Sequence, residues 1–371
     1  MTLAIFGTSN KTFEKRIPIH PQHLIKLPEH ILSQLAFEEN YASDFGFDIN
    51  TIKDKVFGIF PREKLFELFD ILMLPKFSEA DNDNFRNGQT IYGWPHCVQG
   101  DSVTQTAINK KLTLIAFEAM FSGEGTPKHH IFHKNNEMAG FAAIQHSTEL
   151  RGITGYYGGL MKAVVFGFGS TGRGAIHALL AQGISDITVF TRRPPYLVQQ
   201  QIPGVKFEQY FVSDGIALRA NGETIASGLL DIDIIANCIL QDPNNPIDFV
   251  AKGDNQFLKD NAIIADVSCD EAMGFYFARP TTFLEPGFIV DGSNCYYYSV
   301  DHTPSYFWNS SSYELSLSII PFLENMIIEK GYKENNILHN ALEIESGIII
   351  NDSILKFQNR ERDYPHYVLP S

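Results

Sequence analysis

Three glycines in the middle of the chain have the spacing of a phosphate-binding turn. Gly167, Gly169 and Gly172 form the pattern G-x-G-x-x-G within the segment MKAVVFGFGSTGRGAIHALLAQGISDITVFTRR. In such a turn the first glycine permits a tight bend, the second lets the backbone approach a pyrophosphate, and the third lets a helix pack closely on a strand. Ser170 and Thr171 lie where the first N–H groups of that helix would be free to bind phosphate. We therefore predict that these five residues form a dinucleotide-binding site.

The elements that must position these glycines can be read on either side of them. The apolar run 163–166 precedes the glycines and is typical of a strand that is buried on both faces. Residues 175–182 then read as a helix and 187–190 as the next strand. The order strand, glycine turn, helix and strand distinguishes a Rossmann unit from a glycine-rich turn that arises by chance.

The residues after the second predicted strand indicate which dinucleotide binds. A site for NAD usually has Asp or Glu there, about 20 residues after the glycines, to accept a hydrogen bond from the ribose 2′-hydroxyl. This chain has Thr191, Arg192 and Arg193 instead. Two guanidinium groups suit a 2′-phosphate, which arginine can bind through paired hydrogen bonds. A solvated basic turn is the alternative, and we favour NADP(H) as the cofactor.

Length and composition exclude several classes of protein. A chain of 371 residues is long enough for two domains with separate cores. The net charge of −14 argues against nucleic acid as a partner. No run of about 18 apolar residues occurs, so we expect no membrane span. Because the four cysteines lack metal-type spacing and the N-terminal segment does not read as a secretory signal, we expect free thiols and a cytoplasmic protein.

Short apolar runs alternate with helical or turn-rich stretches on both sides of the glycine unit. They predict strands at 3–6, 56–60, 71–74, 90–94, 112–117, 205–211, 232–239, 262–267 and 288–291. Helices are predicted at 21–35, 135–150 and 314–330. This alternation is typical of α/β domains with largely parallel sheets. We predict a two-domain α/β protein in which a Rossmann nucleotide-binding domain, 129–299, is inserted into a discontinuous α/β substrate domain, 1–128 and 300–371, with the substrate between the two.

Several segments resemble, in the same order, those of the alanine dehydrogenase family. They are FEKRIPIHP (13–21), LMLPKFSEAD (72–81), IYGWPHCVQG (91–100), LIAFEAM (114–120), EMAGFAAIQH (137–146) and IIADVSCDEAMGF (263–275). With the glycine turn they cover most of residues 1–310. This family, which includes saccharopine dehydrogenases, makes and breaks C–N bonds at the carbon of a 2-oxo acid through an imine and a hydride. The resemblance implies an oxidoreductase of CH–NH bonds and a homo-oligomer.

Residues 296–316 resemble a narrower group of this family, the N5-(carboxyethyl)ornithine synthases. The segment reads YYYSVDHTPSYFWNSSSYELS, and the chain is somewhat longer than that group's pattern, mostly beyond 314–330. The resemblance implies an NADPH-dependent reductive condensation of a 2-oxo acid, pyruvate, with the side-chain amine of an amino acid, ornithine or lysine. An alanine dehydrogenase, a saccharopine-type enzyme and a nucleotide-sensing protein without catalysis are the alternatives.

The resemblance also implies roles for individual side chains. Arg16 and Lys76 bind the substrate carboxylate and carbonyl, since a guanidinium holds a carboxylate and an ammonium group polarises a carbonyl oxygen. His96 directly follows a predicted strand and is the acid–base group, for which the ordinary histidine pKa of about 6.5 is suitable. Asp270 contacts the ribose or the amine and assists proton transfer, and Lys76 shares in catalysis. We read His302 as lining the substrate and nicotinamide pocket. For each residue an ordinary surface or core role is the alternative.

Three other groups of residues invite a functional reading. Glu118 could also reach the substrate, although a carboxylate at a helix start explains it nearly as well, whereas Asp266 fits a structural role. A histidine cluster at 129–133 lacks a carboxylate or cysteine at ligand spacing, and reduction of an imine needs no metal, so we expect no metal site. The aromatic side chains of 296–308 could wall a deep cleft for an extended amine, or they could pack between the domains.

Overall fold

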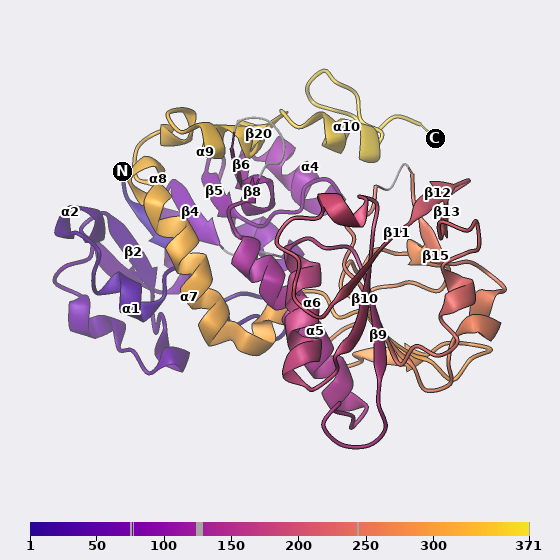
Figure 1. Ribbon diagram of the computed structural model, residues 1–371. Helices are drawn as coiled ribbons and strands as arrows, with labels where there is room; N and C mark the ends of the chain where they lie inside the picture. Colours follow the sequence, from indigo (N-terminus) through magenta and orange to yellow (C-terminus); the bar gives the residue numbers. More distant parts are fainter. Residues whose placement is uncertain (75, 77, 124–128, 243–244, 371) are drawn as a thin grey trace. The chain divides into compact units, whose positions relative to one another are not determined.

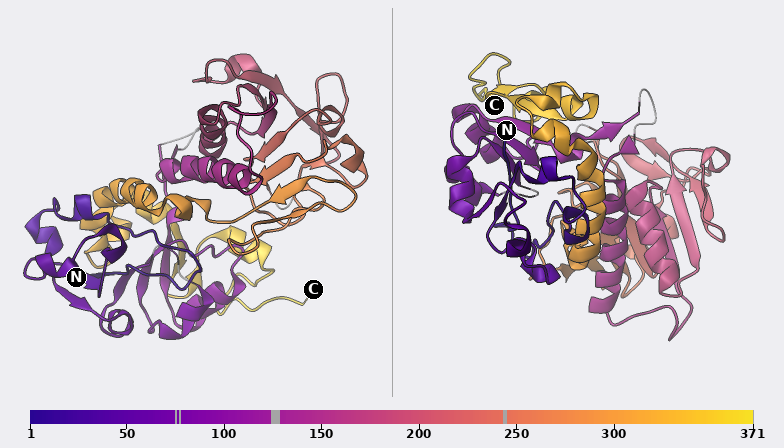
Figure 2. Two further views of the ribbon diagram at one scale, coloured as in Figure 1. Left: turned by 90° about the horizontal axis from the view of Figure 1, so that it is seen from below. Right: turned by 90° about the vertical axis from the view of Figure 1, so that its left-hand side faces the viewer.

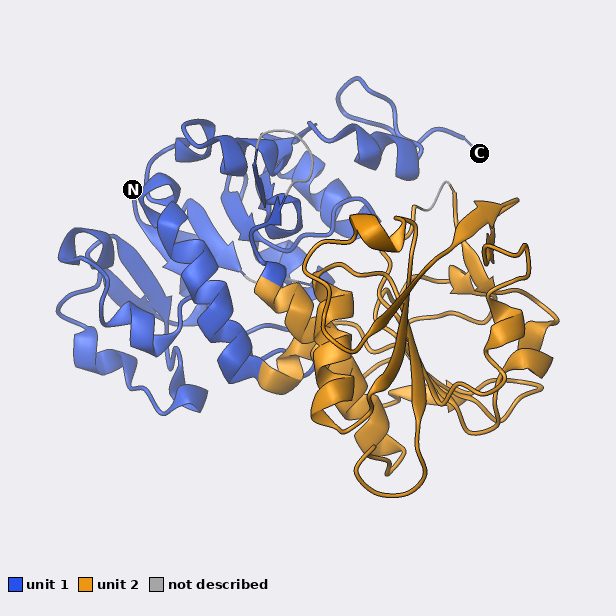
Figure 3. Cartoon of the chain, in the orientation of Figure 1, with its two compact units in different colours: residues 1–133, 308–371 blue, residues 134–307 orange. Residues whose placement is uncertain are grey.

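A computed structural model describes residues 1–74, 76, 78–123, 129–242 and 245–370. The chain divides into two compact units, which Figure 3 shows in different colours. Unit 1 comprises Met1–His133 and Trp308–Ser371, and unit 2 comprises Lys134–Phe307. The two changes of domain predicted from the sequence lie after residues 128 and 299, and the first of these positions lies outside the described residues.

The described residues of unit 1 form an eight-stranded sheet in the order β21-β20-β6-β5-β4-β1-β2-β3 (Figure 1). The strands are β1 Leu3–Ile5, β2 Leu35–Glu38, β3 Gly58–Phe60, β4 Ile71–Leu74, β5 Thr90–Gly93, β6 Thr113–Ala116, β20 Leu342–Glu345 and β21 Ile348–Ile349. Strands β1 to β6 are parallel, whereas β20 pairs antiparallel with β6 and β21. The chain runs from β1 outward to β3 and then returns to β4 on the other side of β1. The sheet therefore has a topological switch point between β1 and β4, where α/β sheets commonly bind ligands.

Both faces of this sheet are covered by apolar side chains. Leu3 and Ile5 belong to one core cluster and Ala4 and Phe6 to the other, as the alternation of side chains along a strand requires. Residues 315–327 of the C-terminal part add several side chains to the first cluster. The helices of unit 1 are α1 Pro21–Leu24, α2 Glu29–Leu32, α3 Arg62–Leu68, α4 Asp101–Asn109, α7 Trp308–Ile319, α8 Leu323–Met326, α9 Asn336–Asn340 and α10 Asp352–Phe357.

Two predicted helices of unit 1 were wrong in extent. The segment 21–35 contains two short helices, α1 and α2, because Pro28 at the N-cap of α2 has no N–H group and disfavours helical backbone in the residue before it. Leu35 is not helical at all but begins β2, whose four residues are all buried. The predicted helix 314–330 starts earlier, at Trp308, and gives way at Ile320–Phe322 to a 3₁₀ turn that contains a proline.

The described residues of unit 2 contain a seven-stranded sheet in the order β11-β10-β9-β14-β16-β19-β18. Its strands are β9 Lys162–Phe166, β10 Asp186–Thr191, β11 Lys206–Gln209, β14 Ile234–Asn237, β16 Ile263–Asp266, β18 Gly287–Ile289 and β19 Tyr296–Tyr298. All except β18 are parallel, and their order is that of a Rossmann fold with its switch point between β9 and β14. A second sheet pairs β12 Phe211–Ser213, β13 Ile216–Leu218, β15 Asp248–Val250 and β17 Gly274–Phe275. The predicted α/β class with a Rossmann arrangement is confirmed.

Two helices of unit 2 approach each other unusually closely. α5 (His133–Leu150) and α6 (Ser170–Ala181) lie side by side in Figures 1 and 2. A Cβ atom added to Gly140 would lie 1.9 Å from the carbonyl oxygen of Thr171, and one added to Gly174 would lie 1.7 Å from that of Glu137. Only glycine permits this contact, which orients the start of α6. In the described part of the chain, no helix combines the length and apolar character that crossing a membrane requires.

Candidate functional site

The glycine turn of unit 2 has the geometry that each of its glycines was predicted to provide. Gly167 follows β9 with a φ of +92°, which residues with a side chain rarely adopt. Gly169 is the N-cap of α6, and a Cβ atom there would have no neighbour within 4 Å. A Cβ atom on Gly172 would lie only 2.2 Å from the carbonyl oxygen of Gly167. The turn is thus tight and closely packed, and it is open on the side where a pyrophosphate would approach the N–H groups of Ser170 and Thr171.

Two exposed arginines follow β10, the strand that pairs with β9. Arg192 and Arg193 directly follow Thr191, the last residue of β10. Within the residues the structure describes, neither guanidinium group has a hydrogen bond or an ion pair. Their charges are therefore available to an anion, as binding of a 2′-phosphate requires.

Arg173, which the sequence analysis did not single out, supports the same region. It lies in the first turn of α6 and donates hydrogen bonds to the carbonyl oxygens of Gln200 (2.9 Å) and Gln199 (3.1 Å). Its guanidinium carbon also lies 4.0 Å from the ring centre of Phe168. Burial lowers the pKa of Arg173, and the positive charge of Arg193 lowers it further. Arg173 thus ties the segment after β10 to the start of α6.

The predicted substrate residues of unit 1 follow three neighbouring parallel strands. Arg16 lies in the segment after β1, Lys76 after β4 and His96 after β5. Because the carboxyl ends of parallel strands lie at one edge of a sheet, all three come from the same edge, on either side of the switch point. The hydroxyl group of Ser9 donates to the carbonyl oxygen of Lys76 at 2.6 Å, which connects the segments after β1 and β4.

Arg16 is buried and paired. Its Nε donates to Oε1 of Glu14 at 2.8 Å, and a second guanidinium nitrogen donates to Oε2 at 2.5 Å. Both side chains of this ion pair are buried. A two-point contact of this kind fixes the plane of the guanidinium group.

His96 faces Glu118, which follows the next strand, β6. The N–H group of His96 donates to Oε1 of Glu118 at 2.7 Å, and its Nδ1 lies 3.8 Å from the same oxygen. Burial raises the pKa of Glu118 to about 8, although the N–H of His96 and the charge of Lys76 favour the carboxylate. Among the described residues, Oε2 of Glu118 has no hydrogen-bond partner. Glu118 therefore lies in contact with the His96 backbone, at the same sheet edge as Arg16 and Lys76.

Asp270 and His302 belong to unit 2. Asp270 lies in the loop after β16, is partly exposed, and has its pKa raised by burial. His302 has a φ of +43° and a side chain that is only 5 % exposed, with Nδ1 bonded to the carboxylate of Asp301. The ring of Phe283 lies 4.7 Å from the imidazole ring. The roles of both residues toward the substrate remain predictions.

Asp266 holds three strand ends of unit 2 together, in keeping with the structural role expected for it. Its buried carboxyl group accepts hydrogen bonds from Asn237 (3.1 Å), from the N–H of Ser268 (3.1 Å) and from the hydroxyl of Tyr297 (2.8 Å). Burial raises its pKa to about 7, against the effect of these donors. The bond to Ser268 also anchors the loop that carries Asp270.

Two of the tyrosines expected as possible walls of a substrate cleft have a different role. Tyr297 and Tyr298 are completely buried and enter the two core clusters on opposite faces of the unit 2 sheet. The hydroxyl of Tyr298 bonds Nδ1 of His146 at 3.0 Å. The expectation was wrong for these two residues because β19 is an inner strand, between β16 and β18, and both of its faces are covered.

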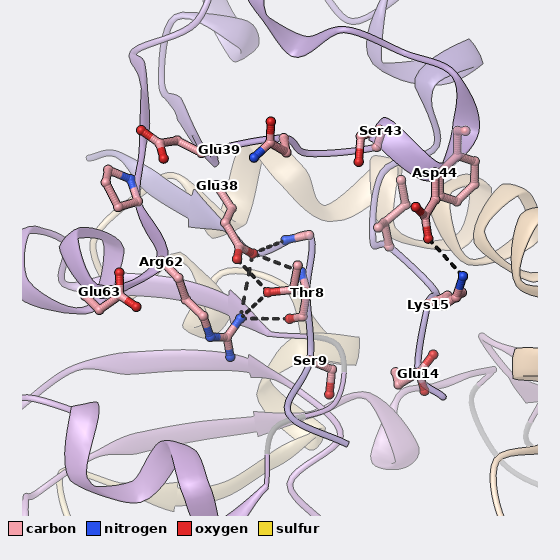
Figure 4. Close-up of a pocket in the computed structure, with 16 residues that line it drawn as sticks. Thr8, Ser9, Glu14, Lys15, Glu38, Glu39, Ser43, Asp44, Arg62 and Glu63 are labelled. Carbon is pink, nitrogen blue, oxygen red and sulfur yellow. Dashed lines mark hydrogen bonds and ion pairs between the residues drawn. The ribbon is translucent and has the colours of Figure 1, made fainter. Parts of the chain in front are cut away.

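A cavity of about 520 Å³ lies in unit 1, lined by residues after β1, β2 and β3 (Figure 4). Its charged lining residues are Glu14, Lys15, Glu38, Glu39, Asp44, Arg62 and Glu63. Glu38 accepts hydrogen bonds from Gly7 and Thr8, so its role is structural. Lys15 pairs with Asp44 at 3.2 Å, as Figure 4 shows, and the side chains of Glu39 and Glu63 have no partner among the described residues.

Trp308 lies beside this cavity. Its ring centre is 4.7 Å from that of Phe45 and 5.9 Å from the ammonium nitrogen of Lys15, and both of these residues line the cavity. Trp308 belongs to residues 296–316, which resemble the N5-(carboxyethyl)ornithine synthases. This segment thus contributes one aromatic side chain to the surroundings of the cavity.

The histidine cluster at 129–133 is explained in part by backbone contacts. Nε2 of His130 lies 3.1 Å from the carbonyl oxygen of Glu118, and its Nδ1 accepts a hydrogen bond from the N–H of Phe132. Both ring nitrogens of His130 are therefore engaged with the backbone.

Comparison with known proteins places these features in a family. The family model "Alanine dehydrogenase/PNT, C-terminal domain" matches residues 139–352. An N(5)-(carboxyethyl)ornithine synthase of Clostridium botulinum is 25% identical in an alignment of 323 residues that covers 81% of this chain and 90% of that protein. An alanine dehydrogenase of Halomonas elongata is 21% identical in an alignment of 308 residues that covers 80% of this chain and 78% of that protein.

Solved structures show the same fold at lower sequence identity. An L-alanine dehydrogenase superposes with a TM-score of 0.76 at 16% identity, covering 96% of this chain and 99% of the other. A transhydrogenase from Sinorhizobium meliloti superposes with a TM-score of 0.70 at 15% identity, covering 95% and 99%. The family that the sequence resembled is confirmed, and the match covers more than half of the chain. The chain therefore belongs to the alanine dehydrogenase/PNT family of nicotinamide-dependent oxidoreductases.

Proposed function

We propose that this protein catalyses the NADPH-dependent reductive condensation of a 2-oxo acid, pyruvate, with the side-chain amine of an amino acid, ornithine or lysine. One observation carries the proposal: Arg16, Lys76 and His96 follow three neighbouring parallel strands of one sheet. They therefore come from the same edge of that sheet, around its switch point. These residues supply an anion ligand, a group that polarises a carbonyl, and an acid–base group, which are the parts that imine formation needs.

Each residue has a defined task in the proposed reaction. The guanidinium of Arg16, oriented by Glu14, binds the carboxylate of the oxo acid, and Lys76 bonds the carbonyl oxygen. The amine nitrogen then attacks the carbonyl carbon, and His96 transfers the two amine protons in turn to the oxygen, which leaves as water when the C–O bond breaks. Glu118, beside His96, favours the protonated imidazole when it is ionised. When bound, NADPH would supply the hydride for the imine carbon, and the imine nitrogen would take up a proton from solvent.

The cavity of unit 1 supports an amine larger than ammonia. Its volume of about 520 Å³ exceeds what ammonia would occupy. The carboxylates of Glu39 and Glu63 suit the α-ammonium group of an amino acid, which would leave the side-chain amine to react. The likeness to the Clostridium botulinum synthase over 81% of this chain points to the same class of substrate.

The choice of NADPH rests on the residues after β10. Arg192 and Arg193 are exposed, and their guanidinium groups have no hydrogen bond or ion pair in the described part of the chain. The sequence has no carboxylate at the position where a ribose 2′-hydroxyl would need one.

A substrate panel tests the proposal. NADPH oxidation is followed with pyruvate and either ammonia, ornithine, lysine, alanine or glutamate. We expect ornithine or lysine to support turnover and to give a secondary amine heavier than either reactant by mass spectrometry. If ammonia alone supports the reaction and alanine is the product, the protein is an alanine dehydrogenase. If no amine supports NADPH oxidation, the proposed activity is excluded and a nucleotide-binding role without catalysis is favoured.

A further inference from the structure

The C-terminal segment of the chain packs against the loop that carries His96. The family match ends at residue 352, whereas the structure describes the chain through α10 and on to residue 370. Gln358 and Arg360 in this continuation are 8 % and 7 % exposed. They form hydrogen bonds with residues between 97 and 105, a segment that contains the loop after His96 and the start of α4. This continuation therefore contributes buried polar side chains to the region behind the proposed acid–base group.

Gln358 bonds the backbone directly after His96. Its Nε2 donates to the carbonyl oxygen of Cys97 at 2.7 Å and lies 3.3 Å from that of Val98. The hydroxyl group of Thr104, in α4, donates to the same Cys97 oxygen at 2.9 Å. The Cys97 carbonyl is thus held from two directions, by the C-terminal segment and by α4.

Arg360 fixes the orientation of the Gln358 amide. Its Nε donates to Oε1 of Gln358 at 2.6 Å, and its Nη1 donates to Oε1 of Gln105 (2.8 Å) and to the carbonyl oxygen of His366 (3.2 Å). Because a guanidinium group can only donate, the amide oxygen of Gln358 must face Arg360 and its NH₂ group must face Cys97. The carbonyl group of Cys97 and the side-chain amide of Gln358 both belong to buried residues. A reversed amide would therefore leave two buried polar groups without partners.

The His96 backbone needs this support. His96 has a φ of +47°, a region in which residues with a Cβ atom are strained unless their surroundings hold them. The contacts that hold it in the described residues include Glu118 at the His96 N–H and Gly100, whose N–H donates to the His96 carbonyl at 2.9 Å. Gln358 restrains the next peptide group along the chain.

We propose that Gln358, oriented by Arg360, is a positioning residue that sets the direction of the His96 side chain. The C-terminal segment then serves the proton transfer without touching the substrate. This inference rests on the proposed function for its catalytic consequence, although the restraint on the loop can be measured independently of activity.

Two substitutions at one position separate loop restraint from general support. Gln358→Leu removes the donor to Cys97 and the acceptor for Arg360. Gln358→Glu keeps an acceptor for Arg360 but places a carboxylate oxygen against the Cys97 carbonyl. If the segment only contributes stability, both Gln358 variants and a control that removes apolar volume from α10 affect the same parts of unit 1; if Gln358 restrains the loop, only the two Gln358 variants affect residues 96–100 selectively. Leu355→Ala, which removes apolar volume from α10 and none of these hydrogen bonds, is the matched control.

Hydrogen exchange measured by mass spectrometry is the readout that does not depend on activity. We expect exchange of peptides that cover 96–100 to become about tenfold faster in both Gln358 variants, which corresponds to the loss of one buried hydrogen bond. Leu355→Ala should leave these peptides unchanged relative to the rest of unit 1. Unchanged exchange at 96–100 in Gln358→Leu, or normal exchange in Gln358→Glu, overturns the proposal.

Kinetics then test the catalytic consequence. With the amine that supports turnover, kcat should fall between about tenfold and a hundredfold in both Gln358 variants, as misplacement of a catalytic group does, with KM for pyruvate nearly unchanged. The pH profile of kcat should shift, whereas Leu355→Ala should keep it. Faster exchange without any change in kcat overturns the positioning role. Absence of turnover in the wild-type protein excludes the proposed function instead, and the exchange result still decides the restraint.

Discussion

Replacement of Asp266 by Asn should make the stability of unit 2 less dependent on pH. The carboxyl group is completely buried between β14, β16 and β19, and burial raises its pKa to about 7. An aspartate in an unfolded chain has a pKa of about 3.9. Asparagine has nearly the same shape, stays neutral at every pH, and keeps an oxygen that can accept from Asn237 and Ser268.

The sign of the effect follows from proton binding. Because the pKa in the folded state is the higher one, the folded protein keeps a proton between about pH 4 and pH 7 that the unfolded chain releases. The contribution of Asp266 to the free energy of unfolding therefore falls as the pH rises through this interval. A difference of about three pKa units corresponds to about 4 kcal/mol in total, of which about 3 kcal/mol falls between pH 5 and pH 8.

The assay must report on unit 2. Both tryptophans, Trp94 and Trp308, belong to unit 1, so their fluorescence is not suitable. Hydrogen exchange of peptides from β9 and β14, corrected for the pH dependence of the intrinsic rate, gives the free energy of opening at pH 5 and pH 8. From pH 5 to pH 8 the free energy of opening should fall by about 3 kcal/mol less in Asp266→Asn than in the wild-type protein. Asp231→Asn, which removes an exposed carboxylate from the same unit, is the control. Equal pH dependence in wild type and Asp266→Asn would refute the reasoning.

Three further outcomes are expected. Replacing both Arg192 and Arg193 by Ser should weaken NADPH binding by about ten- to a hundredfold, because charge-assisted hydrogen bonds are lost, and should leave NADH binding nearly unchanged in calorimetric titrations; an equal loss for both cofactors would contradict the 2′-phosphate site. His96→Ala should lower kcat about 10²- to 10⁴-fold with NADPH affinity unchanged, and an unaffected kcat would exclude His96 as the acid–base group. Gly174→Ala should lower the melting temperature of the protein, since its Cβ atom would lie 1.7 Å from the Glu137 carbonyl oxygen and overpacking costs about 1–3 kcal/mol; a higher melting temperature would show that the helices can separate without cost.

The sequence determined the features that depend on local patterns. The glycine turn could be recognised because its backbone conformations and close approaches involve residues within a few positions of one another. The strands β4, β5, β6, β9 and β16 were predicted within one or two residues, since buried strands are continuous apolar runs. The helix prediction at 21–35 was wrong because Leu35 lies in a buried strand, where packing outweighs helical propensity.

Only the tertiary structure decided which distant residues meet. Glu118, in the turn after β6, accepts from the N–H of His96, 22 residues away, and Gln358 donates to the carbonyl of Cys97, 261 residues away. The close contact of Gly174 with α5 likewise has no sequence signal of its own. Hydrogen bonds and contacts of this kind arise from the order of strands in a sheet and from the docking of separate segments, and neither leaves a periodic pattern in the residues that take part. The residue types that could carry out chemistry were therefore readable from the sequence, whereas the partners that orient them required the fold.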